Sequence, residues 1–290
     1  MSAEQQLAQL EAKVLAAAGI RDYLKRVETL RTLLAAQDAD TIRGLVLAMR
    51  APRVQAQALA AVLDAFGAGA HDALDIVEAA GIDDIARIGR PGNRAKAIVG
   101  GLDKAGREAL ATAQKLARAG ADAQAITAPL IAHANSIQGR VTRAVNMAGN
   151  EGSTAVADAA GLPTVWVAET NACVHCLAYS GRVAKPGKSF PGGLTYGAKS
   201  YHPDPLPHPP LHPNCRCTVE PLNDQSYADA LRREADRSVL RGFSLESESM
   251  GVRIDAAQRL VASGVDAPKS VIALARKSIK RGKFATRGRP

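Results

Sequence analysis

Aromatic residues are scarce in this chain, making up only 3% of its 290 residues. Alanine and leucine abound instead, and this balance favours helices packed through small side chains over a large β-sandwich or barrel. The first residues carry acidic side chains early and lack an uncharged apolar run. We therefore expect neither a secretory signal nor a membrane span. The apolar fraction of 47% is nevertheless ample for a buried core.

Cysteine is also rare, and all four cysteines lie within residues 171–222. They form a Cys-x-x-Cys pair, Cys173 and Cys176, and a Cys-x-Cys pair, Cys215 and Cys217. Eight of the fifteen prolines separate the two pairs, so the segment between them is not helical. Because we expect the protein to be made in a reducing cytosol, a disulfide framework is disfavoured. The spacing indicates a metal site first.

The apolar periodicity predicts a mainly α fold in three segments: a helical N-terminal bundle at 1–125, a small α+β module at 126–222 and a helical C-terminal extension at 223–290. Helices are expected at 3–18, 21–36, 40–50, 52–66, 71–80, 82–88, 94–119, 122–160, 224–241, 252–263 and 267–281. We expect Asp40 and Thr41 to cap the third helix, Gly67 and Gly69 to end the fourth, and glycines at 149–152 to divide the helical stretch 122–160. Alternating residues predict antiparallel strands at 163–169, 181–185 and 217–220.

Zinc prefers four thiolate or imidazole ligands in a tetrahedron. Cys173, Cys176 and Cys215 supply three of them, and either His212 or Cys217 completes the set. His212 is slightly favoured because His212 and Cys215 repeat the spacing of the first pair, although four thiolates satisfy zinc equally well. Four protein ligands leave no position for water, so the expected cofactor is a structural zinc ion and no catalytic residue is assigned.

Other cysteine sites fit less well. Leu177 stands where a c-type haem motif requires histidine, and the His-x-Glu and Pro-Cys-x-x-Cys pieces of a zinc deaminase are missing. A redox dithiol stays open, but the chain lacks the alternating α/β pattern of thioredoxin-like folds. Three further histidines keep a hydrolytic site conceivable, although each is expected to be a loop side chain: His175, His202 and His208.

The net charge is +9, and the last fifteen residues contain no acid. Seven cations lie there: Arg276, Lys277, Lys280, Arg281, Lys283, Arg287 and Arg289. This run is either a solvated tail or an arm that binds nucleic-acid phosphates without sequence preference.

The central stretch resembles the domain of Mu F-like phage minor head proteins, the phage head morphogenesis family. The resemblance rests on Trp166, the Cys173-x-x-Cys176-Leu177 motif, Gly181, the stretch Phe190-Pro-x-Gly-Leu194 and the terminal His212-Pro-Asn-Cys-Arg-Cys-Thr218. It covers about residues 130–222. The terminal signature together with the upstream cysteine pair is the most specific part.

This resemblance implies a minor capsid protein of a tailed phage or prophage, assembled in the host cytoplasm and carried in the virion head near the portal. Its expected roles are head morphogenesis, DNA packaging and DNA ejection. The implied partners are portal protein, capsid or scaffold proteins, phage DNA and other copies of the chain, with no membrane. The resemblance implies no enzymatic activity; the alternative is a metal-dependent nuclease or a head-maturation protease.

Overall fold

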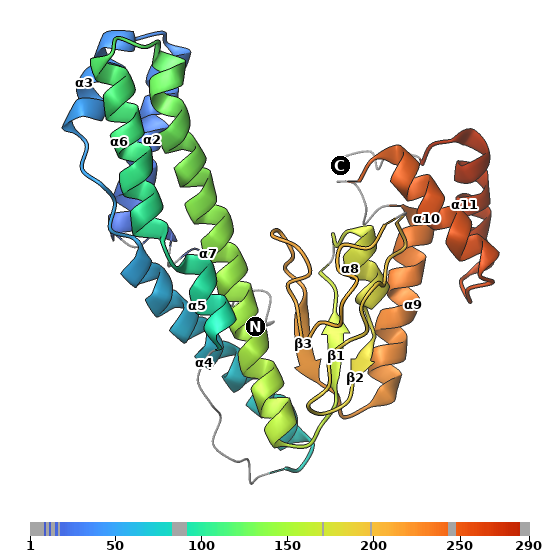
Figure 1. Cartoon of the computed structure of the whole chain (residues 1–290). Coiled ribbons are helices and arrows are strands. Elements are labelled where there is room, and N and C mark those ends of the chain that lie inside the picture. The colour runs from blue at the N-terminus through green and yellow to red at the C-terminus, as the bar shows by residue number, and fades with distance from the viewer. Residues whose placement is uncertain are drawn as a thin grey trace. The chain divides into compact units, whose positions relative to one another are not determined.

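The computed structural model of the chain describes residues 9, 12, 15, 16, 18–82, 92–169, 171–197, 199–242 and 248–284. Helices dominate these residues, as predicted, and the strands among them form a three-stranded sheet (Figure 1). The chain divides into two compact units, each described here by itself. The bundle unit comprises Gln5–Ala65 and Pro91–Ala148, and the cysteine unit contains Phe66–Arg90 and Gly149–Pro290.

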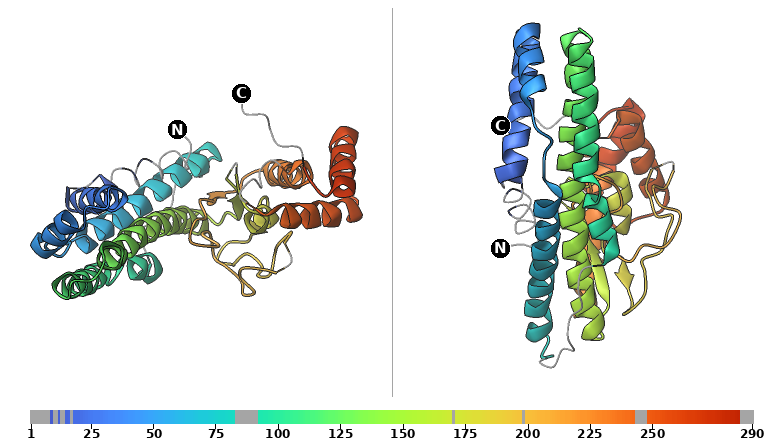
Figure 2. Two further views of the ribbon diagram at one scale, coloured as in Figure 1. Left: turned by 90° about the horizontal axis from the view of Figure 1, so that it is seen from above. Right: turned by 60° about the vertical axis from the view of Figure 1, so that its left-hand side comes forward.

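The bundle unit is a set of helices packed through aliphatic side chains. Its helices are α2 (Ala18–Ala35), α3 (Ala39–Ala48), the start of α4 (Gln55–Ala79), α5 (Asn93–Val99), α6 (Leu102–Arg118) and most of α7 (Ala123–Ala159). Figure 2 shows α6 and α7 running side by side. The fully buried side chains include Ile20, Leu30, Ile42, Leu102, Ile126 and Leu130. Apolar residues recur three or four positions apart within these helices, which is the spacing that places them on one face.

Local chemistry moves some helix ends from their predicted positions. Asp38, rather than Asp40 or Thr41, caps α3, because its carboxylate accepts a hydrogen bond from the Thr41 backbone N–H at 3.1 Å. The predicted helix 94–119 is two helices, α5 and α6. The helix is interrupted at Gly100 and Gly101, and Gly101 adopts a left-handed conformation (φ 75°) before α6 begins.

Two predicted helix breaks are wrong, for one physical reason. Helix α4 runs through Gly67 and Gly69, so residues 71–79 continue it, and α7 runs unbroken through 149–152. A Cβ atom at Gly69 would lie 2.0 Å from the Gly149 carbonyl oxygen, and one at Gly152 would lie 2.2 Å from the Phe66 carbonyl oxygen. These glycines allow the backbones of the two helices to approach within the cysteine unit, and tertiary contact offsets their poor helix propensity.

The sheet of the cysteine unit has the strand order β2-β1-β3, with both pairs antiparallel. Strand β1 is Thr164–Val167, β2 is Val183–Ala184 and β3 is Thr218–Pro221, so the three predicted strands are confirmed. Trp166 lies opposite Val219 in the register and is fully buried. Its ring packs against Tyr179 and Phe190, with centroids 4.7 and 5.3 Å away.

The remaining helices of this unit are α8 (Val174–Tyr179), α9 (Gln225–Arg241), α10 (Met250–Ala262) and α11 (Lys269–Arg281). They confirm the three helices predicted after residue 222. One buried cluster joins the sheet, the proline-rich segment and these helices, and it includes Trp166, Phe190, Leu206, Leu211, Val239 and Leu260. The proline-rich segment therefore contributes apolar side chains to a core that extends into the C-terminal helices.

Two predicted helices lie mostly outside the described residues. They are the helix predicted at 3–18 and the helix predicted at 82–88, of which only residue 82 is described. Within the described part of the chain, no helix is both long and apolar enough to cross a membrane.

Candidate metal centre

Helix α8 positions the first cysteine pair. Cys173 is its N-cap residue, and the Leu177 N–H donates to the Cys173 carbonyl oxygen at 2.9 Å. Cys176 lies in the first turn of the helix, which brings its thiol back toward that of Cys173. The Cys-x-x-Cys spacing thus corresponds to one turn at the start of a short helix, as a two-ligand metal knuckle requires.

A second turn carries the other ligands. The Cys215 N–H donates to the His212 carbonyl oxygen at 3.0 Å, so His212 and Cys215 bracket a tight turn. Cys217 comes directly before β3 and is 1% exposed. Cys215 is fully buried, while Cys173 is only half-buried. The centre is therefore buried on its Cys215 and Cys217 side.

Helix α7 fixes the strand that follows Cys217. Asn150 donates from Nδ2 to the Cys217 carbonyl oxygen at 3.2 Å and accepts from the Val219 N–H at 2.7 Å. Ser153 donates to the Val219 carbonyl oxygen at 2.8 Å. Because β3 is an edge strand, these side chains satisfy backbone groups that have no neighbouring strand. Sequence reasoning missed them, since it assigned 149–152 to a joint between helices.

The structure brings all five predicted ligands together. The Nε2 atom of His212 lies 3.2 Å from the Sγ atoms of both Cys173 and Cys176, and the Sγ atoms of Cys176 and Cys215 are 3.6 Å apart. Two overlapping groups result, each with ligand atoms within 4.8 Å of one another: Cys173, Cys176 and His212, and Cys176, Cys215 and Cys217. Cys176 belongs to both groups and lies at the centre of the cluster.

These distances fit a tetrahedral ion. With a zinc–sulfur bond of about 2.3 Å, tetrahedral geometry places two sulfur ligands about 3.8 Å apart, and a sulfur and a nitrogen ligand slightly closer. The three measured separations lie close to these values. The cluster could therefore hold a metal ion, with one more ligand than a tetrahedron needs.

The charges of the cluster also suit a cation. A hydrogen bond with the Cys176 thiol lowers the pKa of Cys173 to about 4. Burial raises the pKa of Cys215, but hydrogen bonds from the Cys176 and Cys217 thiols outweigh burial and bring it well below its usual value. Hydrogen bonds to neighbouring sulfurs raise the pKa of Cys176 instead. The lowered pKa values favour the thiolate form of Cys173 and Cys215, which is the form that binds a cation. A bound ion would favour ionisation of the other thiols.

Backbone N–H groups support these thiolates. Backbone hydrogen bonds from Cys176 and Leu211 reach the sulfurs of Cys173 and Cys215, respectively, and each lowers the pKa of the thiol that it meets. The pKa of Cys217 lies well above its usual value instead: the hydrogen bond with the Cys176 thiol lowers it, but the Cys215 sulfur and burial together outweigh that effect. Donors to the sulfur are outer contacts that orient metal ligands and spread their negative charge.

The three other histidines of the region lie outside both ligand groups. The Nδ1 atom of His175 is 2.8 Å from the Thr195 hydroxyl oxygen, and the Tyr201 ring lies edge-on to His175 and tilted toward His212. His202 is half-buried. The Nδ1 atom of buried His208 is 2.6 Å from the Pro209 carbonyl oxygen. His175 and Tyr201 therefore flank the centre, and His208 is bound to the backbone.

The predicted nucleic-acid ligands fall on and just after the last helix. Five of them are exposed: Arg276, Lys277, Lys280, Arg281 and Lys283. The buried residues Val271, Ala275 and Ser278 lie on the face of α11 that packs inward. Arg287 and Arg289 lie outside the described residues.

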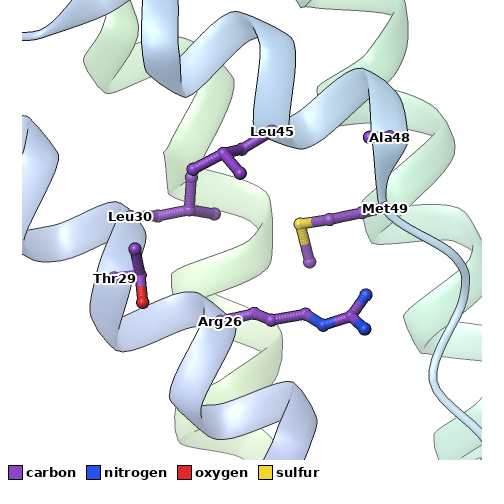
Figure 3. A pocket seen from close by; sticks show the side chains of 6 residues that line it. All are labelled: Arg26, Thr29, Leu30, Leu45, Ala48 and Met49. Carbon is purple, nitrogen blue, oxygen red and sulfur yellow. The ribbon is translucent and has the colours of Figure 1, made fainter.

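A separate hollow of about 200 Å³ lies in the bundle unit between α2 and α3 (Figure 3). The side chains of Leu30 and Leu45 point toward one another across it, and Arg26 extends past Met49 with its guanidinium group directed away from the leucines. Arg26 is the only ionisable group among the described residues that line it. The hollow is mostly apolar, and its described lining offers no acid–base pair.

Comparison with protein-family models, curated proteins and solved structures found no match for this chain. The fold and the cluster alone therefore define its class. It is a mainly helical protein with a small three-stranded sheet and a Cys/His cluster that could hold a metal ion.

Proposed function

We propose that this chain is a minor head protein of a tailed phage or prophage, carried in the head near the portal, with a structural rather than an enzymatic role. The observation that carries the proposal is the convergence of the family-like motif residues on one centre. The cysteine pair at 173 and 176 meets the His-Pro-Asn-Cys-Arg-Cys stretch with ligand separations of 3.2 to 3.6 Å. The motif that suggested the family is thus also a spatial unit.

The metal in this proposal is zinc, held by Cys173, Cys176, Cys215 and His212. Thiolate and imidazole ligands in a tetrahedron are the preferred environment of zinc, and four protein ligands close its coordination sphere. The ion would join α8 to the turn at 212–215, which lies shortly before β3. Binding free energy at such a site is also folding free energy, so the ion acts as a staple for the proline-rich segment.

The basic face of α11 is the proposed contact for phage DNA. Two adjacent pairs of exposed cations, Arg276 and Lys277 and then Lys280 and Arg281, lie four residues apart, so they project from one side of the helix toward solvent. Such a surface neutralises phosphates without reading bases, which suits a protein that handles DNA of any sequence during packaging and ejection. Portal and capsid or scaffold proteins are the proposed protein partners.

Quantitative mass spectrometry of purified particles tests the proposal. We expect a few copies per virion, recovered with the portal when heads are disassembled. The major capsid protein and the portal protein provide internal standards for copy number. Absence of the chain from both virions and procapsids, with normal head assembly in its deletion mutant, would refute the role.

A further inference from the structure

The cysteine unit contains a second site that is separate from the cysteine cluster. A cavity of about 380 Å³ opens where the segment after β2 meets helices α9 and α10. This volume lies within the range of small-molecule sites, which occupy about 300–1,000 Å³. None of the described residues that line it belongs to the two metal-ligand groups.

The cavity has a surplus of positive charge. Three arginines line it, Arg182, Arg232 and Arg259, and Asp236 is the one acidic residue among the described lining residues. Arg232 already pairs with Asp236, with Nη2 and Oδ1 2.6 Å apart. The charge of Arg182 also acts on Asp236, so the three arginines share one carboxylate and the described lining keeps a surplus of two positive charges. Burial lowers the pKa of Arg232 and the charge of Asp236 raises it, while the charge of Arg182 lowers it again, so these two cations repel one another.

The structure holds Arg232 and Arg259 in place before any ligand arrives. Nη1 of Arg232 donates to the carbonyl oxygens of Ala178 and Ser180, at 3.0 and 3.2 Å, at the end of α8. Arg259 donates to the Gly197 carbonyl oxygen. The guanidinium carbon of Arg232 lies 5.2 Å from the centre of the Tyr196 ring. Side chains fixed in this way lose little conformational entropy on binding, so the site is preorganised.

Part of the cavity lining is apolar. Leu260 of α10 is buried, and Val265, which follows that helix, is half-buried; both line the cavity. A ligand that matches the whole cavity therefore carries an anionic group at one end and an apolar or planar group at the other.

We propose that this cavity binds a phosphate monoester, with the phosphate between Arg182 and Arg259 and the esterified group against Leu260 and Val265. A phosphate monoester carries a charge of about −1.5 to −2 at neutral pH, which matches the two surplus cations better than a carboxylate does. Guanidinium groups bind phosphate through paired N–H donors. The same chemistry is present in a free nucleotide and at the 5′ end of a DNA strand. The site would bind this group whether or not the chain belongs to a phage head.

Calorimetric titration of the full chain with adenosine monophosphate tests the proposal at fixed ionic strength. We expect saturable binding, no binding of adenosine, and competition by inorganic phosphate. Arg182→Gln should weaken binding by about tenfold or more, the typical loss for a charge-assisted hydrogen bond. Arg182 is exposed, so this variant should keep the fold, as checked by circular dichroism. Lys188→Gln removes the same charge from an exposed residue nearby in the sequence and should bind as the parent does.

A second pair of ligands distinguishes the two sources. A single-stranded oligonucleotide with a 5′ phosphate is compared with the same oligonucleotide lacking it. Tighter binding of the phosphorylated strand that disappears in Arg182→Gln assigns the site to DNA ends; nucleotide binding without that preference assigns it to free phosphate esters. Absence of saturable binding by every phosphate ligand, or equal affinity in the parent and Arg182→Gln, would overturn the proposal.

Discussion

The imidazole of His212 lies between two thiols from a distant helix, with Nε2 3.2 Å from the Sγ atom of Cys176 and also 3.2 Å from that of Cys173. This relationship favours His212 over Cys217 as the fourth ligand. Burial lowers the pKa of His212, but the hydrogen bond to Cys173 and the nearby thiolates raise it above its ordinary value. The imidazole therefore lies in the negative electrostatic potential of the cysteine sulfurs, where a metal ion would bind.

We therefore predict that His212→Gln lowers zinc affinity by more than about 100-fold, which exceeds the loss typical for a residue that contacts a ligand but not the metal. Cys217→Ser should lower zinc affinity by less than about tenfold. Competition with a chromophoric chelator measures both affinities. When cobalt(II) replaces zinc, the thiolate-to-metal charge-transfer band of Cys217→Ser should keep the intensity of the parent, because Cys217 is not a ligand in the proposed set. Metal loss in Cys217→Ser with full retention in His212→Gln would instead establish four thiolates as the ligand set.

The metal is also predicted to stabilise the cysteine unit. Cys173→Ser should abolish stoichiometric zinc and lower the melting temperature, because the binding free energy of a structural zinc ion contributes directly to folding. Metal analysis and thermal denaturation measure the two effects, and Ser189→Ala, at an exposed position of the proline-rich segment, is the control. A Cys173→Ser variant that loses its zinc but keeps the melting temperature of the parent would contradict the structural role of the metal.

The close approach of α4 and α7 in the cysteine unit predicts opposite effects for two substitutions in one helix. A Cβ atom at Gly152 would lie 2.2 Å from the Phe66 carbonyl oxygen, whereas none of the described atoms beyond its own helix lies within 4 Å of a Cβ atom at Gly139. Gly152→Ala should destabilise the protein by about 1–3 kcal/mol through overpacking. Gly139→Ala should stabilise it by about 0.5–1 kcal/mol through helix propensity. Urea denaturation measures both, and equal effects would show that the helices do not touch at Gly152.

Glu220 on β3 predicts a pH-dependent change. Burial raises the pKa of its carboxyl group and the charge of Asp72 raises it further, although the Tyr227 hydroxyl donates to Oε2 at 3.0 Å. A carboxyl group whose pKa is higher in the folded chain favours folding when protonated, and this advantage is lost as pH rises from the unfolded value of 4.5 through the folded one.

Glu220→Gln keeps an oxygen that accepts from Tyr227 and removes the charge from a half-buried position. We expect a higher melting temperature than the parent at pH 7 and no difference below about pH 4, where the parent carboxyl group is protonated too. Glu78→Gln, at an exposed position of α4, is the matched control for the removal of one carboxylate. A gain of equal size at both pH values would point to packing rather than ionisation.

The basic face of α11 predicts salt-dependent DNA binding. Four exposed cations on the helix are changed to glutamine together: Arg276, Lys277, Lys280 and Arg281. Each phosphate that these substitutions leave unneutralised should reduce the slope of log K against log salt by about 0.9. The matched control removes four exposed cations from α6: Lys104, Arg107, Lys115 and Arg118. Fluorescence anisotropy on a duplex measures both slopes, and identical slopes in the two variants would exclude α11 as the DNA contact.

Sequence reasoning predicted most elements because local patterns specify them. The alternation around Trp166 predicted β1, and apolar spacing after residue 222 predicted three helices whose bounds agree within a few residues. It failed at Gly69 and Gly152, where it assigned breaks. A glycine that ends a helix and a glycine that admits a neighbouring backbone are identical in sequence, and only the position of the second helix distinguishes them.

The sequence by itself determined the chemistry of the candidate metal centre: it identified the residues that supply sulfur and nitrogen, and it predicted that the two cysteine pairs meet across the prolines. Tertiary structure decided how they meet, since the 3.2 Å contacts of His212 depend on where the fold places the turn at 212–215 relative to α8. It also decided that Arg182, Arg232 and Arg259 share one cavity. Residues from the segment after β1, from α9 and from α10 carry no common spacing, so only the packing of those elements brings their charges together.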